Sequence, residues 1–148
     1  MAAQRDFEEL LELLNSKRIK YLVVGGYALA FHGAPRYTGD IDIFVKPDSR
    51  NASLIISALK KFGLGGLDIK KSDFEKPGFV IQLGFPPVRI DLITSLTGVS
   101  WKESFSNKVR GKYGNVPVNY IGREQLIKNK KALARKKDIA DIEALGQK

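Results

Sequence analysis

The stretch at residues 23–45, VVGGYALAFHGAPRYTGDIDIFV, constrains the fold more than any other part of the chain. It opens within an apolar run of strand-forming residues at 21–24, which two glycines close. The apolar residues 27–31 suit one or two helical turns, and the proline that follows prevents the helix from continuing. The alternating run at 40–45 predicts a second strand. A strand, a tight turn, a short helix and a second strand must therefore follow one another closely.

Patterns elsewhere in the chain predict further helices and strands around this unit. The expected helices span residues 4–16, 47–63, 123–134 and 137–145, and the expected strands span 79–83, 88–93, 108–113 and 116–120. Residues 84–87 are expected to join one strand pair, and Gly114-Asn115 to turn a hairpin between the last two strands. Because strands and helices alternate without a strict βαβ rhythm, the sequence predicts an α+β fold with helices packed against a mixed sheet.

The length and composition fit one globular domain. The 148 residues suffice for one hydrophobic core, and we expect a catalytic core at 1–122 and basic C-terminal helices at 123–148 within the same domain. No apolar stretch reaches the roughly 20 residues that cross a bilayer, and the acidic N-terminal segment does not resemble a signal peptide. The chain has no cysteine, which excludes disulfides, zinc–thiolate sites and thiol nucleophiles. These features predict a cytoplasmic protein without a membrane partner.

The formal net charge of +9 indicates polyanionic partners. A surplus of positive charge concentrates nucleic acids, nucleotides or acidic proteins near the surface. Charge alone does not distinguish among these three classes.

Three acidic residues are the best candidates for chemistry. Asp40 and Asp42 stand two apart in a predicted strand, so both carboxylates leave the same face of the sheet. Asp91 lies at the centre of the run at 88–93 and completes a triad if the two strands are neighbours. Clustered carboxylates suit a hard cation such as Mg²⁺ or Mn²⁺. An edge strand with an acidic solvent-facing side would give the same Asp-x-Asp pattern.

The glycine pair suggests phosphate binding beside these carboxylates. Gly25 and Gly26 stand where a strand turns into a helix, and the first N–H groups of a helix have no intrahelical partner. Without a Cβ atom, glycine allows a phosphate to approach the backbone closely. Such a pair is, however, also common in ordinary tight turns.

Together these elements resemble the polymerase β-like nucleotidyltransferase superfamily. The shared features are the Gly-Gly turn, the Asp40-Ile41-Asp42 strand about a dozen residues later, and a separate strand with a third aspartate. Arg36, Thr38 and the tail IGREQLIKNKKALARKKDIADIEAL look closest to small bacterial and archaeal branches, namely the minimal and the AbiEii-type toxin nucleotidyltransferases. The resemblance covers most of the chain, although residues 64–76 and 96–107 contribute little.

The resemblance implies a metal-dependent enzyme that moves a nucleoside monophosphate from an NTP such as ATP to an acceptor hydroxyl. It implies that Asp40, Asp42 and Asp91 are the catalytic and metal-binding residues. It also implies a set of nucleotide-binding residues, which comprises Gly25, Gly26, Arg36, Thr38, Lys130, Arg135 and Lys137. In one respect the chain departs from the pattern, since many members carry serine at the position of Gly26 and so have one more hydroxyl donor.

Several other residues have a structural explanation beside a functional one. His32 is the only histidine, and a hydrogen-bonded histidine at a helix end is the simpler expectation. Trp101, Phe105 and Tyr113 could stack a base, but lone aromatic residues more often belong to the core. The basic cluster of the tail could equally be a solvated helix face, and Asp138 and Asp141 are expected to pair with nearby Lys and Arg residues.

Three functions remain open from the sequence. The first is an active transferase acting on an RNA end or a protein. The second is a non-catalytic nucleotide- or RNA-binding module that serves as a regulatory or toxin–antitoxin partner. The third is an RNA-binding protein that depends on charge alone. A chain of this size could also form its cleft with a second copy or with a partner protein.

Overall fold

A computed structural model describes residues 4–35, 38–64, 68–85 and 88–146 of the chain. Its strands are β1 (Tyr21–Val24), β2 (Asp40–Val45), β3 (Val80–Phe85), β4 (Val88–Ile93), β5 (Val109–Tyr113) and β6 (Val116–Tyr120). Its α-helices are α1 (Arg5–Ser16), α2 (Gly25–Phe31), α3 (Ser49–Leu59), α4 (Trp101–Ser106), α5 (Arg123–Leu133) and α6 (Lys136–Ala144). Two short irregular segments, η1 (Lys60–Leu64) and η2 (Lys71–Phe74), lie between α3 and β3.

The six strands form one mixed sheet in the order β3-β4-β2-β1-β6-β5. The central pair, β1 and β2, is antiparallel, and each of the two has a parallel neighbour on its outer side, β6 and β4 respectively. Both edge strands, β3 and β5, run antiparallel to the strand beside them. This arrangement confirms the predicted α+β class and places β2 next to β4, which are the two strands that carry the aspartates.

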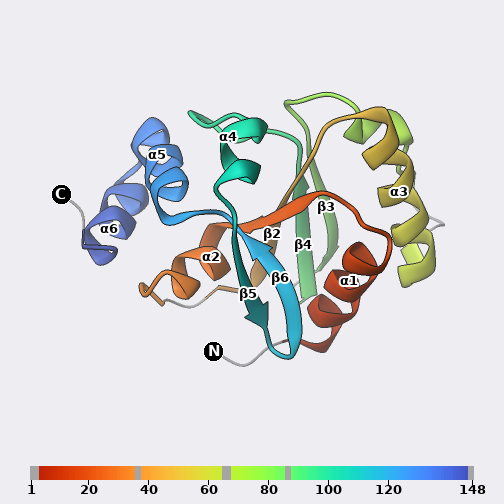
Figure 1. Cartoon of the computed structure of the whole chain (residues 1–148), viewed down its shortest axis with the longest axis horizontal. Coiled ribbons are helices and arrows are strands. Elements are labelled where there is room, and N and C mark those ends of the chain that lie inside the picture. The colour runs from red at the N-terminus through yellow and green to blue at the C-terminus, as the bar shows by residue number, and fades with distance from the viewer. Residues whose placement is uncertain (1–3, 36–37, 65–67, 86–87, 147–148) are drawn as a thin grey trace.

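Two groups of helices lie at opposite ends of the molecule, with α2 and α4 between them (Figure 1). Helix α1 packs near α3, while α5 and α6 lie together at the other end of the molecule. The apolar stripe predicted for α1 is fully buried and consists of Phe7, Leu10, Leu11 and Leu14. Burying a side chain of this size contributes roughly 1.5–3 kcal/mol to folding. The four residues of β1 are buried as well, as expected for a central strand.

Most predicted elements occur in the structure, with two kinds of difference. The predicted connector at 84–87 is shorter than expected, because Gly84 and Phe85 still pair with Arg89 and Val88 at the end of β3. The predicted helix at 47–63 stays regular only to Leu59, after which η1 bends and contains Gly63 at φ 102°. Positive φ is the conformation that glycine adopts without a steric penalty.

The sequence patterns above did not predict helix α4, although the residues at its start carry a local signal for it. The Ser100 hydroxyl accepts a hydrogen bond from the Glu103 N–H at 3.1 Å and so caps the helix. Serine followed three residues later by glutamate is typical of a helix start. In the described part of the chain, no helix is both long enough and apolar enough to span a membrane.

Candidate active site

The register of β2 against β4 brings the three predicted aspartates together. Asp42 pairs with Asp91 across the parallel strands, and Asp40 pairs with Arg89. Alternation along β2 places Asp40 and Asp42 on one face, and Asp91 shares that face. One carboxylate oxygen from each aspartate lies within 4.8 Å of the others. Two separate stretches of chain therefore supply one acidic cluster.

The electrostatics of this cluster favour a bound cation. Burial, followed by the charges of Asp91 and Asp40, raises the pKa of Asp42 from 3.8 to about 7. Burial disfavours an ionised carboxylate, and neighbouring negative charges add to that effect. Asp91 is only 7% exposed, so little water is available to relieve the repulsion. A hard divalent ion with oxygen ligands fits this donor set.

Arg89 is a member of the cluster for which the sequence predicted no role. Its Nε and one terminal nitrogen donate to the two carboxylate oxygens of Asp91, both at 3.1 Å. The Nε atom also lies 3.9 Å from a carboxylate oxygen of Asp40. The position of Arg89, two residues before Asp91 on the same strand, is the signal that could have identified it. This two-pronged pairing fixes the orientation of the Asp91 carboxylate.

Both glycines at the start of α2 are required by close contacts. Gly25 adopts φ +66°, and a Cβ atom there would collide with the carboxylate of Asp42. A Cβ atom on Gly26 would lie 2.8 Å from the Thr38 hydroxyl oxygen. Thr38 therefore fills the space that a side chain at position 26 would need. The Thr38 hydroxyl itself donates to the backbone oxygen of Asp40 at 3.1 Å.

A cavity of about 350 Å³ opens beside these groups. One wall contains Gly25, Gly26 and Asp42. The opposite wall comes from α5, α6 and the loop between them, and it includes Lys130, Arg135 and Lys137. Five of the predicted nucleotide-binding residues line this cavity, namely Gly25, Gly26, Lys130, Arg135 and Lys137. A sixth, Thr38, packs against Gly26. Arg36 lies outside the described residues.

The three basic residues of the second wall differ in their surroundings. Lys130 is buried, and its Nζ lies 2.8 Å from Asp141 and 3.7 Å from Asp138. Arg135 is exposed, but its guanidinium donates to the fully buried Asp138 at 2.6 Å and 3.1 Å. Lys137 is exposed. The predicted pairing of both aspartates with nearby basic residues is confirmed, and it ties α5 to α6.

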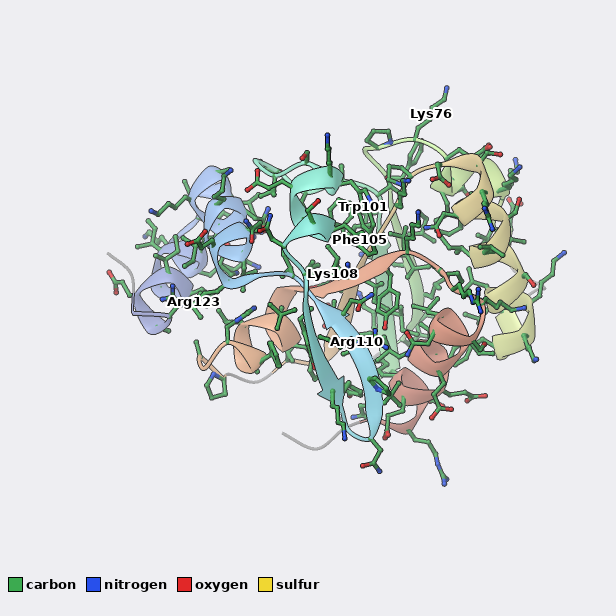
Figure 2. The ribbon with its side chains drawn as sticks, viewed as in Figure 1. Lys76, Trp101, Phe105, Lys108, Arg110 and Arg123 are labelled. Atoms are coloured by element: carbon green, nitrogen blue, oxygen red, sulfur yellow. The ribbon has the colours of Figure 1, made fainter. Side chains whose placement is uncertain are left out.

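The remaining singled-out residues have structural partners. His32 at the end of α2 places Nε2 2.7 Å from the carbonyl oxygen of Ile121. Trp101 stacks on Phe105 at 5.0 Å and meets Phe44 edge-on at 4.9 Å. Figure 2 shows Trp101 and Phe105 on α4, with Lys108 nearby; its ammonium lies 4.0 Å from the ring centroid of Phe105.

Tyr113 belongs to the interior of the protein. It is 5% exposed, and its ring lies 5.2 Å from that of Tyr27 and 6.3 Å from that of Phe7. The structural explanation given above for these aromatic residues therefore accounts for Tyr113 as well.

Solved structures of nucleotidyltransferases share this fold. A lincosamide antibiotic adenylyltransferase, LnuA, is 14% identical, with a TM-score of 0.63 over 98% of this chain and 97% of its own. The antibiotic-resistance factor ANT(2'')-Ia is 12% identical, with a TM-score of 0.61 over 95% and 80% of the two chains. A putative nucleotidyltransferase from Thermotoga maritima is 15% identical, with a TM-score of 0.60 over 96% and 89%.

A comparison with family models identifies the chain more directly. No curated protein sequence matches the chain. The model of the family described as "Nucleotidyl transferase of unknown function (DUF2204)" matches residues 3–148. The superfamily resemblance is thereby confirmed, and the chain belongs to this nucleotidyltransferase family.

Proposed function

We propose that this nucleotidyltransferase moves a nucleoside monophosphate from an NTP to an acceptor hydroxyl and releases pyrophosphate. The observation that supports this proposal is the meeting of Asp40, Asp42 and Asp91 within 4.8 Å. One of the three, Asp42, also lines the cavity that contains the glycine turn. Acidic oxygens beside a phosphate-sized opening are what phosphoryl transfer needs, because its catalysis is mainly positioning and charge stabilisation.

In this proposal the cluster holds Mg²⁺ or Mn²⁺. Asp40 and Asp42 would supply ligands, and Asp91 would complete the set. The crowded negative charge fits this role, because it raises the pKa of Asp42 in the absence of a cation. A divalent ion there supplies charge stabilisation for the α-phosphate and lowers the pKa of the attacking hydroxyl.

The protein's own residues would manage the proton and the leaving group. The acceptor oxygen forms a bond to the α-phosphorus, and the bond from that phosphorus to the bridging oxygen breaks, so that pyrophosphate leaves. Asp91 takes the hydroxyl proton, as a general base within hydrogen-bond reach would. Arg89 keeps the Asp91 carboxylate in a fixed orientation through its two hydrogen bonds.

The cavity walls would hold the triphosphate. Backbone N–H groups at Gly25 and Gly26 are the proposed donors on one side, with Arg36 as a further candidate. A phosphate role for Thr38 stays a prediction, since its hydroxyl already donates to the backbone oxygen of Asp40. On the other side, Arg135 and Lys137 would face the β- and γ-phosphates. A phosphate role for Lys130 stays a prediction, since its charge is already shared with Asp138 and Asp141.

The acceptor is proposed to be an RNA end, a protein hydroxyl or a small alcohol. The net charge of +9 favours RNA, because phosphodiesters are attracted to basic surfaces. The name of one structural neighbour, a lincosamide adenylyltransferase bound to lincomycin, adds a small-molecule acceptor to the set. All three share the hydroxyl that the chemistry requires.

The test is a transfer assay with purified protein, Mg²⁺ or Mn²⁺, and each of the four α-³²P-labelled NTPs. RNA, protein and lincosamide or aminoglycoside acceptors are offered in separate reactions. We expect label on one acceptor class, abolished in Asp42→Asn and retained in Asp68→Asn, which removes an exposed carboxylate outside the site. Tight MgATP binding without transfer to any acceptor would instead support the non-catalytic module.

A further inference from the structure

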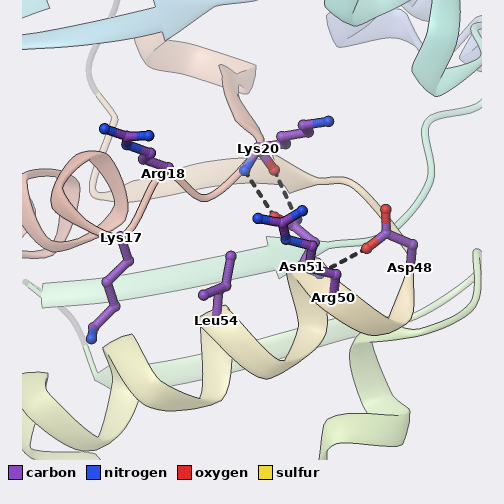
Figure 3. A pocket seen from close by; sticks show the side chains of 7 residues that line it. All are labelled: Lys17, Arg18, Lys20, Asp48, Arg50, Asn51 and Leu54. Carbon is purple, nitrogen blue, oxygen red and sulfur yellow. Dashed lines mark hydrogen bonds between the residues drawn. The ribbon is translucent and has the colours of Figure 1, made fainter.

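A second cavity, of about 300 Å³, lies where α1, β1 and α3 meet. Four of its seven lining residues are cationic: Lys17, Arg18, Lys20 and Arg50. Figure 3 shows these side chains arising from the end of α1, the start of β1 and the start of α3, around Leu54. We call this cavity the basic pocket.

The basic pocket is separate from the acidic cluster. Lys20 immediately precedes β1, whereas Val24 at the other end of that strand pairs with Asp42. Four residues of extended strand span roughly 13 Å. The two sites therefore occupy opposite ends of the central strand pair.

The positive charge of the basic pocket is not neutralised from within. None of the four cationic side chains forms an ion pair with a carboxylate of another described residue. The single carboxylate in the lining, Asp48, is already engaged. It accepts the Asn51 N–H at 2.7 Å as the cap of α3, and it lies 3.3 Å from Lys46.

The frame beneath the cations is fixed. Asn51 is 3% exposed, and its side chain accepts the Lys20 N–H at 2.9 Å. The same side chain donates to the backbone oxygens of Lys20 and Lys46, both at 3.0 Å. One buried amide thus joins α3 to both central strands, and the charges are carried on a preorganised scaffold. Preorganisation lowers the entropy cost of binding a ligand.

The backbone of Arg18 adopts a conformation that suits glycine better than arginine. Arg18 closes α1 at φ 56°, with the Ile19 N–H donating to the Leu14 oxygen at 3.0 Å. This is a helix ending in which glycine is the favoured residue, because a Cβ atom is strained there. Arginine at position 18 places a positive charge at the rim of the pocket, although glycine would adopt this backbone conformation at a lower energetic cost.

We propose that the basic pocket binds an anion with several linked phosphate groups. Four uncompensated cations match a chain of phosphates, and the lining has no aromatic side chain on which a base could stack. Recognition would then depend on phosphate charge and spacing, and not on the base. An RNA backbone and a free polyphosphate share this chemistry.

The test is an NMR titration of ¹⁵N-labelled protein with inorganic tripolyphosphate in EDTA, which withholds the metal from the acidic cluster. We expect the largest shifts at the amides of Lys20 and Asn51. Arg18→Gly and Arg50→Gln should each weaken binding about tenfold, whereas Arg18→Lys should retain it. Lys76→Gln removes an exposed charge elsewhere and should change little (Figure 2).

Thermal melting separates binding from folding. Because glycine suits the backbone at position 18, Arg18→Gly should raise the Tm by about 3 °C while it weakens binding. Ala134→Gly relieves the same kind of strain at the end of α5 (φ 54°) without removing a charge, so it should raise the Tm and leave binding intact. Shifts confined to Gly25, Gly26 and Arg135, or equal affinity in Arg18→Gly and wild type, would overturn the proposal.

The same variants identify the source of the phosphates. If the ligand is RNA, a uridine oligonucleotide should shift the same amides, and tripolyphosphate should displace it. If only tripolyphosphate shifts them, the pocket serves a free polyphosphate. Since no metal or NTP is present, the result does not depend on whether the transferase proposal holds.

Discussion

The two walls of the proposed NTP cavity handle charge in opposite ways. On the wall that contains Asp42, which we call the acidic wall, burial and the charges of the adjacent Asp91 and Asp40 raise the pKa of Asp42 to about 7. On the helix wall, Lys130 and Arg135 are paired with buried aspartates at 2.8 Å and 2.6 Å. Crowded carboxylates favour a bound cation, whereas a network of satisfied ion pairs indicates a structural role. We therefore propose that the metal chemistry depends on the acidic wall, whereas the ion pairs of the helix wall hold α5 to α6.

The largest expected effect is the loss of transfer in Asp42→Asn. Removing one carboxylate from the cluster should lower the metal-dependent rate at least about 1000-fold, which corresponds to about 4 kcal/mol of transition-state stabilisation. The metal-free variant should remain folded. Transfer rates together with far-ultraviolet circular dichroism check this, and retention of more than a tenth of the rate would remove Asp42 from the catalytic role.

Substitutions in the helix wall should lower the free energy of unfolding. Lys130→Met removes the ammonium group that lies beside the buried carboxylates of Asp141 and Asp138. Breaking a buried ion pair in this way costs about 3 kcal/mol or more. Urea denaturation measures the free energy of unfolding, with Lys131→Met as the matched control because Lys131 is exposed on the same helix. Equal stability of the two variants would mean that the network does not hold α6.

The acidic wall also predicts a dependence of stability on pH. Because the folded-state pKa of Asp42 is about 7 rather than 3.8, the folded protein keeps a proton that the unfolded chain has released between these values. In EDTA, stability should therefore fall as the pH rises from 5 to about 7 and then level off. We expect wild type to lose about 2 kcal/mol more than Asp42→Asn over this range.

Denaturation midpoints at pH 5, 6, 7 and 8 for both proteins give that difference directly. Saturating Mn²⁺ should abolish it, because a bound cation stabilises the ionised carboxylate. An identical pH profile in wild type and variant would show that Asp42 titrates normally.

Arg89 provides the smallest and most discriminating effect. It occupies both oxygens of Asp91, so it opposes the binding of a cation to the cluster. Arg89→Gln should tighten Mn²⁺ binding about tenfold, a change of about 1.4 kcal/mol, and slow transfer by releasing Asp91. Electron paramagnetic resonance measures the free Mn²⁺, with Arg5→Gln as a control in an exposed helix position. Weaker binding in Arg89→Gln would mean that arginine organises the ligands instead.

The acidic wall was largely predictable, whereas the helix wall was predictable only in part, because the sequence indicated that Asp138 and Asp141 pair with basic residues but not which residues they meet. Alternation fixed the common face of Asp40 and Asp42, but their proximity to Asp91 depends on β2 lying beside β4, which became an expectation only through the resemblance. The pairing of Lys130 with Asp141 depends on how α5 turns into α6 at Ala134, whose positive φ has no marker in the sequence. Arg89 was overlooked because a basic residue near an acidic one is common on exposed strands.

For the two glycines of the turn, the sequence predicted the local conformation but not the contact that requires it. The sequence predicted that Gly25 and Gly26 form a tight turn beside a phosphate site. It did not predict that Gly26 must lack a side chain because of Thr38, since that contact joins residues on either side of a loop. Helix α4 could have been found from Ser100 and Glu103, whose spacing marks a helix start.

The most direct test of the acidic cluster is a crystal structure of the protein soaked with Mn²⁺ and a non-hydrolysable NTP analogue. We predict an anomalous peak coordinated by oxygens of Asp40 and Asp42, with Asp91 adjacent and the triphosphate against Gly25 and Gly26. A triphosphate bound elsewhere, or manganese absent from the three carboxylates at saturating concentration, would contradict the proposed catalytic centre.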